Sequence, residues 1–308
     1  MNKKKKVELV LGSGGARGIA HISVIERLLK DGYEIERVVG CSMGAVVGGV
    51  YCAGYLEVYK EWLLTINKTQ LFNLMDFTIT NMGFLKGERV LGKMQEITGE
   101  QKIEDLPIPF VAVAADMINR KEVHFTKGDM YAAIRASMSI PGIFTPIWHN
   151  GTILVDGGVL NPLPLNLAKR DPETLVVAVS LNGPNPEHIP VVDDTSDEIP
   201  VPSEAAKPNA SLAQTWWSKW LPQMNSKPKT TTPKFSLVDL LAHSYEFTQD
   251  KLVELTLETY KPDITVHIPS NSCSIFEFYK TKQMLKIGHE AYDKAMQVYH
   301  ESNGLTIS

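Results

Sequence analysis

The segment around Ser42 constrains the fold of this chain more than any other. It reads Gly40-Cys41-Ser42-Met43-Gly44 and lies between an apolar strand, Arg37-Val38-Val39, and a run of small residues, Ala45-Val46-Val47-Gly48-Gly49. A serine at such a strand-to-helix turn is typical of a nucleophile elbow, where glycines fit beside the serine and its hydroxyl is presented at the edge of a sheet. Backbone amides at the positive end of the helix then lie near any oxyanion that forms. The segment predicts an α/β fold with a reactive serine where a strand ends.

A glycine-rich loop precedes this elbow. An apolar strand with Val7 and Leu9–Leu11 runs into Gly12-Ser13-Gly14-Gly15-Ala16-Arg17-Gly18, and a helix with apolar residues at helical spacing follows. Strand, loop and helix N-terminus together form a nest of backbone donors for an anion. A dinucleotide-binding unit has a similar loop but needs an acidic residue at the end of its second strand. Here that strand ends in Cys41 and Ser42, so the dinucleotide interpretation is disfavoured.

An aspartate downstream is the candidate base. The short apolar strand 152–155 runs into Asp156-Gly157-Gly158. An isolated Asp-Gly-Gly most often forms a plain turn. A serine at its free pKa is a poor nucleophile and needs a proton acceptor, so beside an elbow and an anion-binding loop Asp156 becomes the candidate partner of Ser42.

These three motifs, in this order, resemble those of the patatin-like phospholipases, most closely the short bacterial members. Three further blocks carry the resemblance: Phe84-Leu85-Lys86-Gly87-Glu88-Arg89, Val111-Ala112-Val113-Ala114-Ala115-Asp116 and Arg135-Ala136-Ser137-Met138-Ser139-Ile140-Pro141-Gly142. The resemblance covers residues 7–180 closely and the part after Phe235 more loosely. The family's loop usually begins with a glycine where this chain has Ser13.

The resemblance implies a three-layer α/β sandwich with a mostly parallel central sheet and helices on both faces. It also implies a lipid acyl-ester hydrolase in which Ser42 and Asp156 act as a dyad and the amides of Gly14 and Gly15 form the oxyanion hole. The implied substrate is a phospholipid or another lipid ester, and neither a cofactor nor a metal is implied. The motif residues expected to support this site are Gly12, Arg17, Gly18, Gly40, Gly44, Gly157 and Gly158.

Other mechanisms and functions stay open at this point. A triad would take its histidine from His188, His243, His267, His289 or His300, and His267, after an apolar strand, is the one worth testing. The elbow follows the second expected strand, earlier than an ordinary α/β-hydrolase places it, so the sequence favours the dyad. The alternatives in function are a lipid acyltransferase and a lipid-binding regulator with little turnover.

Composition sets the broad class of the protein. The 308 residues carry a formal net charge of −4, which gives no global basic surface and does not indicate a nucleic-acid partner. Three scattered cysteines predict a reducing compartment without a disulfide framework. Apolar runs are short and broken by charge, and Glu8 interrupts a signal-peptide pattern, so we expect a cytoplasmic protein. The lysines 3–6 raise the further hypothesis of contact with the inner face of a membrane.

The chain organises into three stretches. Residues 7–182 form the expected catalytic core, 183–235 a proline-rich and acidic insertion, and 236–300 helices and a strand that complete the same domain. Residues 56–95 are expected to form a helical cover over the site. Within the insertion, Trp216, Trp217 and Trp220 fall on adjacent rows of a helix. That segment suits a membrane interface, with packing on the protein's own body or on a second copy in a homodimer as the alternative.

Overall fold

The computed structural model describes residues 5–80, 83–184 and 237–304. The chain divides into two compact units, residues 1–184 with 247–308, and residues 185–246. Trp216, Trp217 and Trp220 lie outside the described residues, so the interface hypothesis for them stays a prediction.

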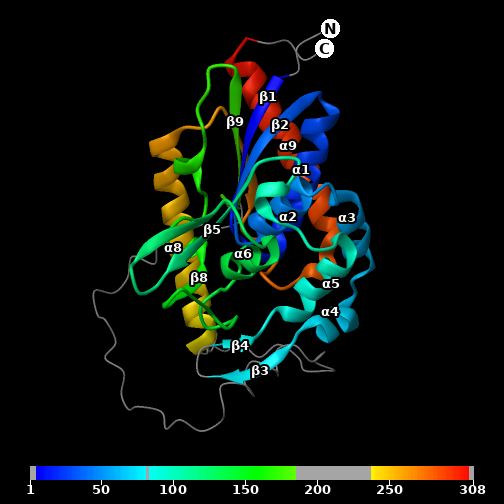
Figure 1. Cartoon of the computed structure of the whole chain (residues 1–308). Helices are drawn as coiled ribbons and strands as arrows, with labels where there is room; N and C mark the ends of the chain where they lie inside the picture. Colours follow the sequence, from blue (N-terminus) through cyan, green and yellow to red (C-terminus); the bar gives the residue numbers. More distant parts are fainter. Residues whose placement is uncertain (1–4, 81–82, 185–236, 305–308) are drawn as a thin grey trace, which may run out of the picture. The chain divides into compact units, whose positions relative to one another are not determined.

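The first unit alternates strands and helices along the chain (Figure 1). Its main strands are β1 (Lys5–Leu11), β2 (Tyr33–Cys41), β5 (Phe110–Asp116), β6 (Lys121–Phe125), β7 (Ile147–His149), β8 (Thr152–Asp156), β9 (Thr174–Gly183) and β10 (Ile264–Pro269). The α-helices, counting one that begins in the second unit, are α1 (Ala20–Lys30), α2 (Met43–Cys52), α3 (Leu56–Thr65), α4 (Lys68–Leu74), α5 (Glu88–Thr98), α6 (Met130–Ser137), α8 (Leu237–Tyr260) and α9 (Thr281–Ser302). A single 3-10 turn, Gly15–Ile19, leads from the glycine loop into α1.

The strands form one mixed sheet in the order β10-β9-β1-β2-β5-β8-β7, with β6 also paired to β5. The five strands from β10 to β5 run parallel, and β6, β7 and β8 are antiparallel to their neighbours. Val7, Leu9, Val10 and Leu11 of β1 are all fully buried. A strand that is covered on both faces of a sheet needs apolar residues at successive positions, which explains this continuous apolar run.

Apolar side chains on the two faces of the sheet form two separate cores. Leu9 and Val38 face the helices α1, α2 and α9, whereas Val10 and Val39 face the segment 163–168 and Val253 of α8. This arrangement is the three-layer α/β sandwich with a mostly parallel central sheet that the sequence predicts.

The expected helical cover over residues 56–95 is only partly helical. Between α4 and α5 the chain forms a hairpin of β3 (Phe77–Thr80) and β4 (Gly83–Leu85), which lies in cyan at the bottom of Figure 1. Strands of three and four residues carry too little periodicity to be distinguished from loop by sequence. Asp76, just before β3, accepts hydrogen bonds from the amides of Gly87, Glu88 and Arg89 and so joins the hairpin to the start of α5.

Candidate active site

Ser42 lies in a strained turn between β2 and α2. Its backbone has φ 54° and ψ −119°, a region that residues other than glycine rarely adopt. A Cβ atom added to Gly40 would lie 2.4 Å from the carbonyl oxygen of Gly44, and one added to Gly44 would lie 2.1 Å from that of Leu11. Glycine is therefore the residue that fits both positions, and the turn has the backbone geometry of an elbow.

Two strands that end at the same place bring Ser42 and Asp156 together. β6 pairs with one edge of β5 along residues 112–116, so β2 and β8 both pair with the opposite edge. β2 pairs there up to Cys41, opposite Val113, and β8 arrives from the other direction and ends at Asp156, opposite Ala114. The serine and the aspartate thus come from the facing ends of two strands. The Sγ atom of Cys41 lies 3.8 Å from Oδ1 of Asp156.

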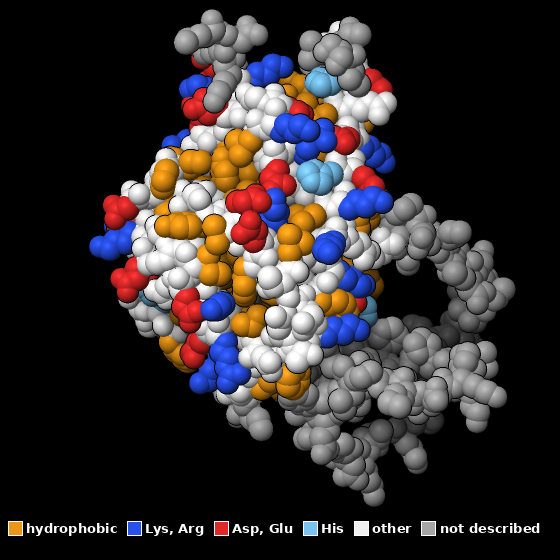
Figure 2. Space-filling view, turned by 90° about the vertical axis from the view of Figure 1, so that its right-hand side faces the viewer, with side chains coloured by type: hydrophobic (Ala, Val, Ile, Leu, Met, Phe, Trp, Pro, Cys, Tyr) orange, Lys and Arg blue, Asp and Glu red, His pale blue; other side chains and the backbone are white. Residues whose placement is uncertain are grey.

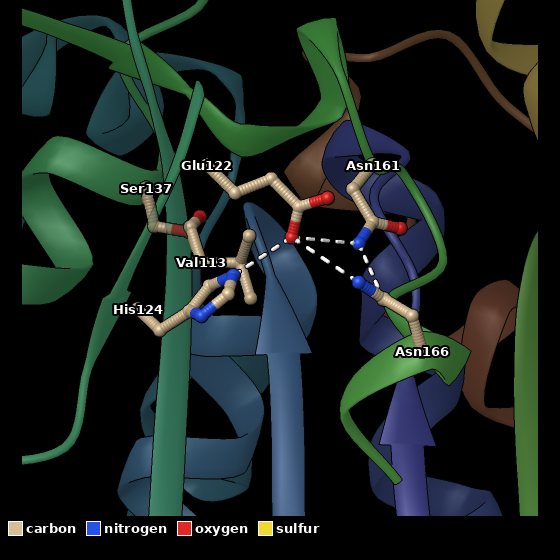
Figure 3. Close-up of polar contacts among 6 residues, drawn as sticks. All are labelled: Val113, Glu122, His124, Ser137, Asn161 and Asn166. Carbon is tan, nitrogen blue, oxygen red and sulfur yellow. Dashed lines mark hydrogen bonds and ion pairs between the residues drawn. The ribbon is translucent and has the colours of Figure 1, made fainter.

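The end of α6 contacts both residues. The backbone amide of Ser42 donates to Oγ of Ser137 at 2.8 Å. That hydroxyl donates to the carbonyl of Val113 at 2.6 Å, and Figure 3 draws both Ser137 and Val113. The amide of Asp156 donates to the carbonyl of Ser139 at 2.9 Å. Oδ1 of Asp156 also accepts from the amide of Gly158 at 2.7 Å. One short segment therefore fixes the backbone on both sides of the pair.

Arg135 braces that segment from within the protein. Its guanidinium donates to the hydroxyl of Ser139 and to the carbonyl of Thr145, the latter at 2.8 Å, and it lies over the ring of Phe144. Burial lowers the pKa of Arg135. Arg135 and Ser139 fall in one of the blocks that resemble the family, but no role was predicted for either from sequence.

A polar network holds the turn that follows the aspartate. Glu122 accepts hydrogen bonds from His124 at 2.7 Å and from the side-chain amides of Asn161 and Asn166 (Figure 3). The backbone amide of Asn161 in turn donates to the carbonyl of Gly157 at 2.8 Å. No sequence pattern indicated this network, because Glu122 lies on β6 and is distant in the chain from Asn161 and Asn166.

Two amides of the glycine loop, those of Gly14 and Gly15, are the expected oxyanion donors. The neighbouring amides are all engaged: Gly12 donates to Val179, Ser13 to Pro162 and Ala16 to Ile275. Within the described ranges, no carbonyl accepts a hydrogen bond from the amides of Gly14 or Gly15. Gly15 lines the same cavity as Ser42. The assignment of these two amides to an oxyanion hole stays a prediction.

Side chains around the loop keep it in place. Arg17 is buried, and its Nε donates to the carbonyl of Gly14 at 3.2 Å. A Cβ atom on Gly18 would lie 2.3 Å from the side chain of Met43, so the loop packs directly on the elbow. Ser13, where the family usually has glycine, accepts a hydrogen bond from Gln249 of α8 at 3.2 Å.

His21 lies beneath the loop and was not among the candidates from sequence. It is fully buried, and its Nε2 lies 3.0 Å from the carbonyl oxygen of Gly12, so Nε2 carries the hydrogen. Burial lowers the pKa of His21 to about 4, which keeps the ring neutral near pH 7.

This burial predicts a loss of stability in mild acid. Between pH 6.5 and 4.5 the unfolded chain protonates His21 and the folded chain largely does not, so the free energy of unfolding should fall by roughly 2 kcal/mol through this residue. His21→Gln keeps a donor for Gly12 but does not titrate. Urea unfolding of both proteins at pH 6.5 and 4.5 is the measurement. The decrease in the free energy of unfolding should be smaller in the variant than in the wild type by that amount. Equal decreases in the two proteins would contradict the assignment.

An apolar cavity opens beside Ser42. It holds about 900 Å³ of space between atoms, its open mouth included. Its walls come from Met43 and Val46 of α2, Tyr59, Trp62 and Leu63 of α3, Leu71 and Leu74 of α4, and Val90, Leu91 and Met94 of α5, with Phe144 and Phe276 from loops. Val46, Tyr59 and Met94 are at most 3% exposed, so these lining residues are buried.

The lining of the cavity is almost without charge. Among the described residues that line it, Asp76 is the one with an ionisable side chain that is charged at neutral pH, and that carboxylate is engaged by the amides at the start of α5.

His267, the histidine worth testing for a triad, lies away from Ser42. His267 is on β10, which is separated from β2 by β9 and β1. His267 and Ser42 are therefore about 14 Å apart across the sheet. His289 and His300 belong to α9, His243 lies in the second unit, and His188 falls outside the described residues.

The described residues contain neither a candidate metal site nor a candidate membrane-spanning helix. No group of three or more His, Cys, Asp and Glu side chains in the described ranges is placed to hold a metal ion. No described helix has both the length and the hydropathy that crossing a membrane requires.

Comparisons with known proteins identify the family. VipD from Legionella pneumophila aligns with a TM-score of 0.44 and 13% identity over 96% of this chain and 67% of its own. Lysophospholipase NTE1 of Yarrowia lipolytica is 30% identical over 223 residues, which are 70% of this chain and 14% of that protein. An uncharacterised NTE family protein of Mycobacterium bovis is 32% identical over 332 residues, covering 96% of this chain and 92% of the relative. A family model described as patatin-like phospholipase matches residues 9–169. On this family match and the mycobacterial relative, the chain belongs to the patatin-like phospholipase family.

Proposed function

We propose that this protein is a serine hydrolase that releases fatty acid from lipid esters through Ser42 and Asp156. The observation that carries the proposal is the placement of the two residues at the facing ends of β2 and β8, with an apolar cavity opening beside the serine. Family membership supports the same reaction class.

The chemistry requires one proton acceptor and one anion site. Asp156 takes the proton of the Ser42 hydroxyl as its oxygen attacks the ester carbonyl. The amides of Gly14 and Gly15 stabilise the resulting oxyanion, and the alcohol leaves with a proton returned by Asp156. Water then attacks the acyl-enzyme by the same route and releases the fatty acid. Removing one such oxyanion donor typically costs about 3–4 kcal/mol of transition-state stabilisation.

The cavity supports a lipid with its acyl chain inside and its head group outside. Its walls are aliphatic and aromatic, and its carboxylate at Asp76 is already engaged by backbone amides. A charged head group would lose hydration there without gaining a partner. Lysophospholipids, the substrates implied by the name of the Yarrowia relative, fit this description.

Covalent labelling tests the nucleophile. A fluorophosphonate probe should modify the wild-type protein at Ser42, and Ser42→Ala should abolish both labelling and the release of fatty acid from a panel of lipid esters read by mass spectrometry. Labelling at Ser137 or Ser139 with Ser42 unmodified would overturn the proposal. An acyl product that forms only when an acceptor alcohol is added would show acyl transfer instead of hydrolysis.

A further inference from the structure

Apolar side chains project from the sheet beyond the active site. The amide of Met117, just past β5, donates to the carbonyl of Ile153 on β8, and Ile153 pairs with Trp148 on β7. Residues directly opposite one another on paired strands point to the same face, so these three side chains form one row. Ile118 follows in the turn after β5. Met117 is 49% exposed, Ile118 54% and Trp148 64%. We call these four residues the apolar rim.

The apolar rim lies at the same end of the sheet as the serine. Cys41, the residue before Ser42, pairs with Val113. From Val113 the chain continues in the same direction through the end of β5 at Asp116 to Met117. At 3.3 Å per residue, the rim projects about 10 Å beyond Ser42 along the strand direction. Phe144, which lines the cavity, lies only four residues before Trp148 in the chain.

The charge around the apolar rim differs from that of the whole chain. Arg120 and Lys121 are exposed directly after the rim turn. Along residues 116–121 and 145–153 the one acid is Asp116, which is buried and accepts hydrogen bonds from Asn119 and Thr152. By contrast, Figure 2 shows acidic and basic side chains interspersed on the face that includes α3. A chain with net charge −4 therefore carries a locally basic, apolar edge.

We infer that the apolar rim, with Arg120 and Lys121, docks this protein on the surface of an anionic lipid bilayer. Exposed Trp, Ile and Met side chains enter the boundary between head groups and acyl chains, and the two cations interact with acidic head groups. Docking there places the end of the sheet that carries Ser42 next to the bilayer. The inference concerns binding alone and does not depend on turnover.

Sedimentation with vesicles tests this surface without catalysis. The full-length Ser42→Ala protein should bind vesicles containing phosphatidylglycerol more tightly than vesicles of phosphatidylcholine, and 0.5 M salt should weaken binding because it screens the cations. The triple variant Met117→Ser, Ile118→Ser, Trp148→Ser should bind at least tenfold more weakly. The pair Arg120→Glu, Lys121→Glu should lose the preference for anionic vesicles. Val58→Ser with Val298→Ser, at exposed sites on α3 and α9, is the matched control and should bind normally.

The outcomes separate this inference from its rivals and from the proposed function. In an otherwise wild-type protein, the triple variant should hydrolyse a short soluble ester at the normal rate, because none of its three changes lines the cavity. Unchanged vesicle binding by the triple variant would overturn the inference. So would a dimer of the parent protein that the same substitutions dissociate, because the rim would then contact a second copy. Inactivity of the wild-type protein on every ester would overturn the proposed function and leave the binding result standing.

Discussion

Asp156→Asn should lower kcat on a soluble ester by about ten-thousand-fold, the upper range for loss of a general base. Asparagine has the same shape and still accepts the hydrogen bond from the amide of Gly158, so the loop geometry should persist. It does not take the Ser42 proton, and His267, the histidine worth testing for a triad, lies three strands away on β10. The measurement is kcat together with thermal unfolding of both proteins.

Two controls keep this result specific. Asp116→Asn makes the same chemical change at another buried carboxylate. Asp116 lies on β5, two residues past Ala114, the residue that faces Asp156, and it accepts hydrogen bonds from Asn119 and Thr152. It should alter stability and leave kcat within a few-fold of wild type. His267→Ala, on the outer strand β10, should be nearly silent. Equal losses of kcat in His267→Ala and Asp156→Asn, at equal stability, would contradict the dyad.

Val46→Phe should change which acyl chains are hydrolysed. Val46 lies one helical turn beyond Ser42, about 6 Å along α2, and its side chain lines the cavity. A phenyl ring there would fill the space past the first few carbons of an acyl chain. Excluding about four methylenes, each contributing about 0.8 kcal/mol, predicts a decrease of roughly 100-fold in kcat/KM for a palmitoyl ester. The butyryl ester should be hydrolysed at close to the normal rate.

The ratio of the two kcat/KM values is the decisive quantity. Val46→Thr has nearly the same volume as the wild type and should leave the ratio within a few-fold, which makes it the size-matched control. If Val46→Phe lowers both activities equally while the melting temperature is unchanged, the acyl chain does not bind in this cavity, although Ser42 could still be the nucleophile.

Features of this molecule that depend on nearby residues were more predictable from sequence than features that depend on contacts between distant residues. The elbow at Ser42 was predictable because glycine is forced at Gly40 and Gly44 by contacts within a few residues and with the adjacent strand. The family and the α/β sandwich were predicted and are confirmed. The meeting of β2 and β8 on one edge of β5 was not predictable, because strand direction and register depend on contacts between residues 38 to 72 positions apart in the chain.

The supporting residues were missed for a related reason. Ser137 and Arg135 act through contacts with Val113 and Thr145, and nothing in their own spacing indicates those contacts. No role was predicted for His21 from sequence, and only its position beneath Gly12 shows that it is buried and neutral.

The end-to-end meeting of β2 and β8 has a consequence for how this protein can diverge. The serine and the aspartate are positioned by a shared neighbour, β5, and not by the length of chain between them. The helices α3, α4 and α5, which wall the cavity, all belong to that intervening chain. Insertions or replacements in this cover can therefore reshape the acyl site while the two reacting groups keep their register. Substrate range and bond-breaking chemistry are thus free to evolve at different rates within one polypeptide.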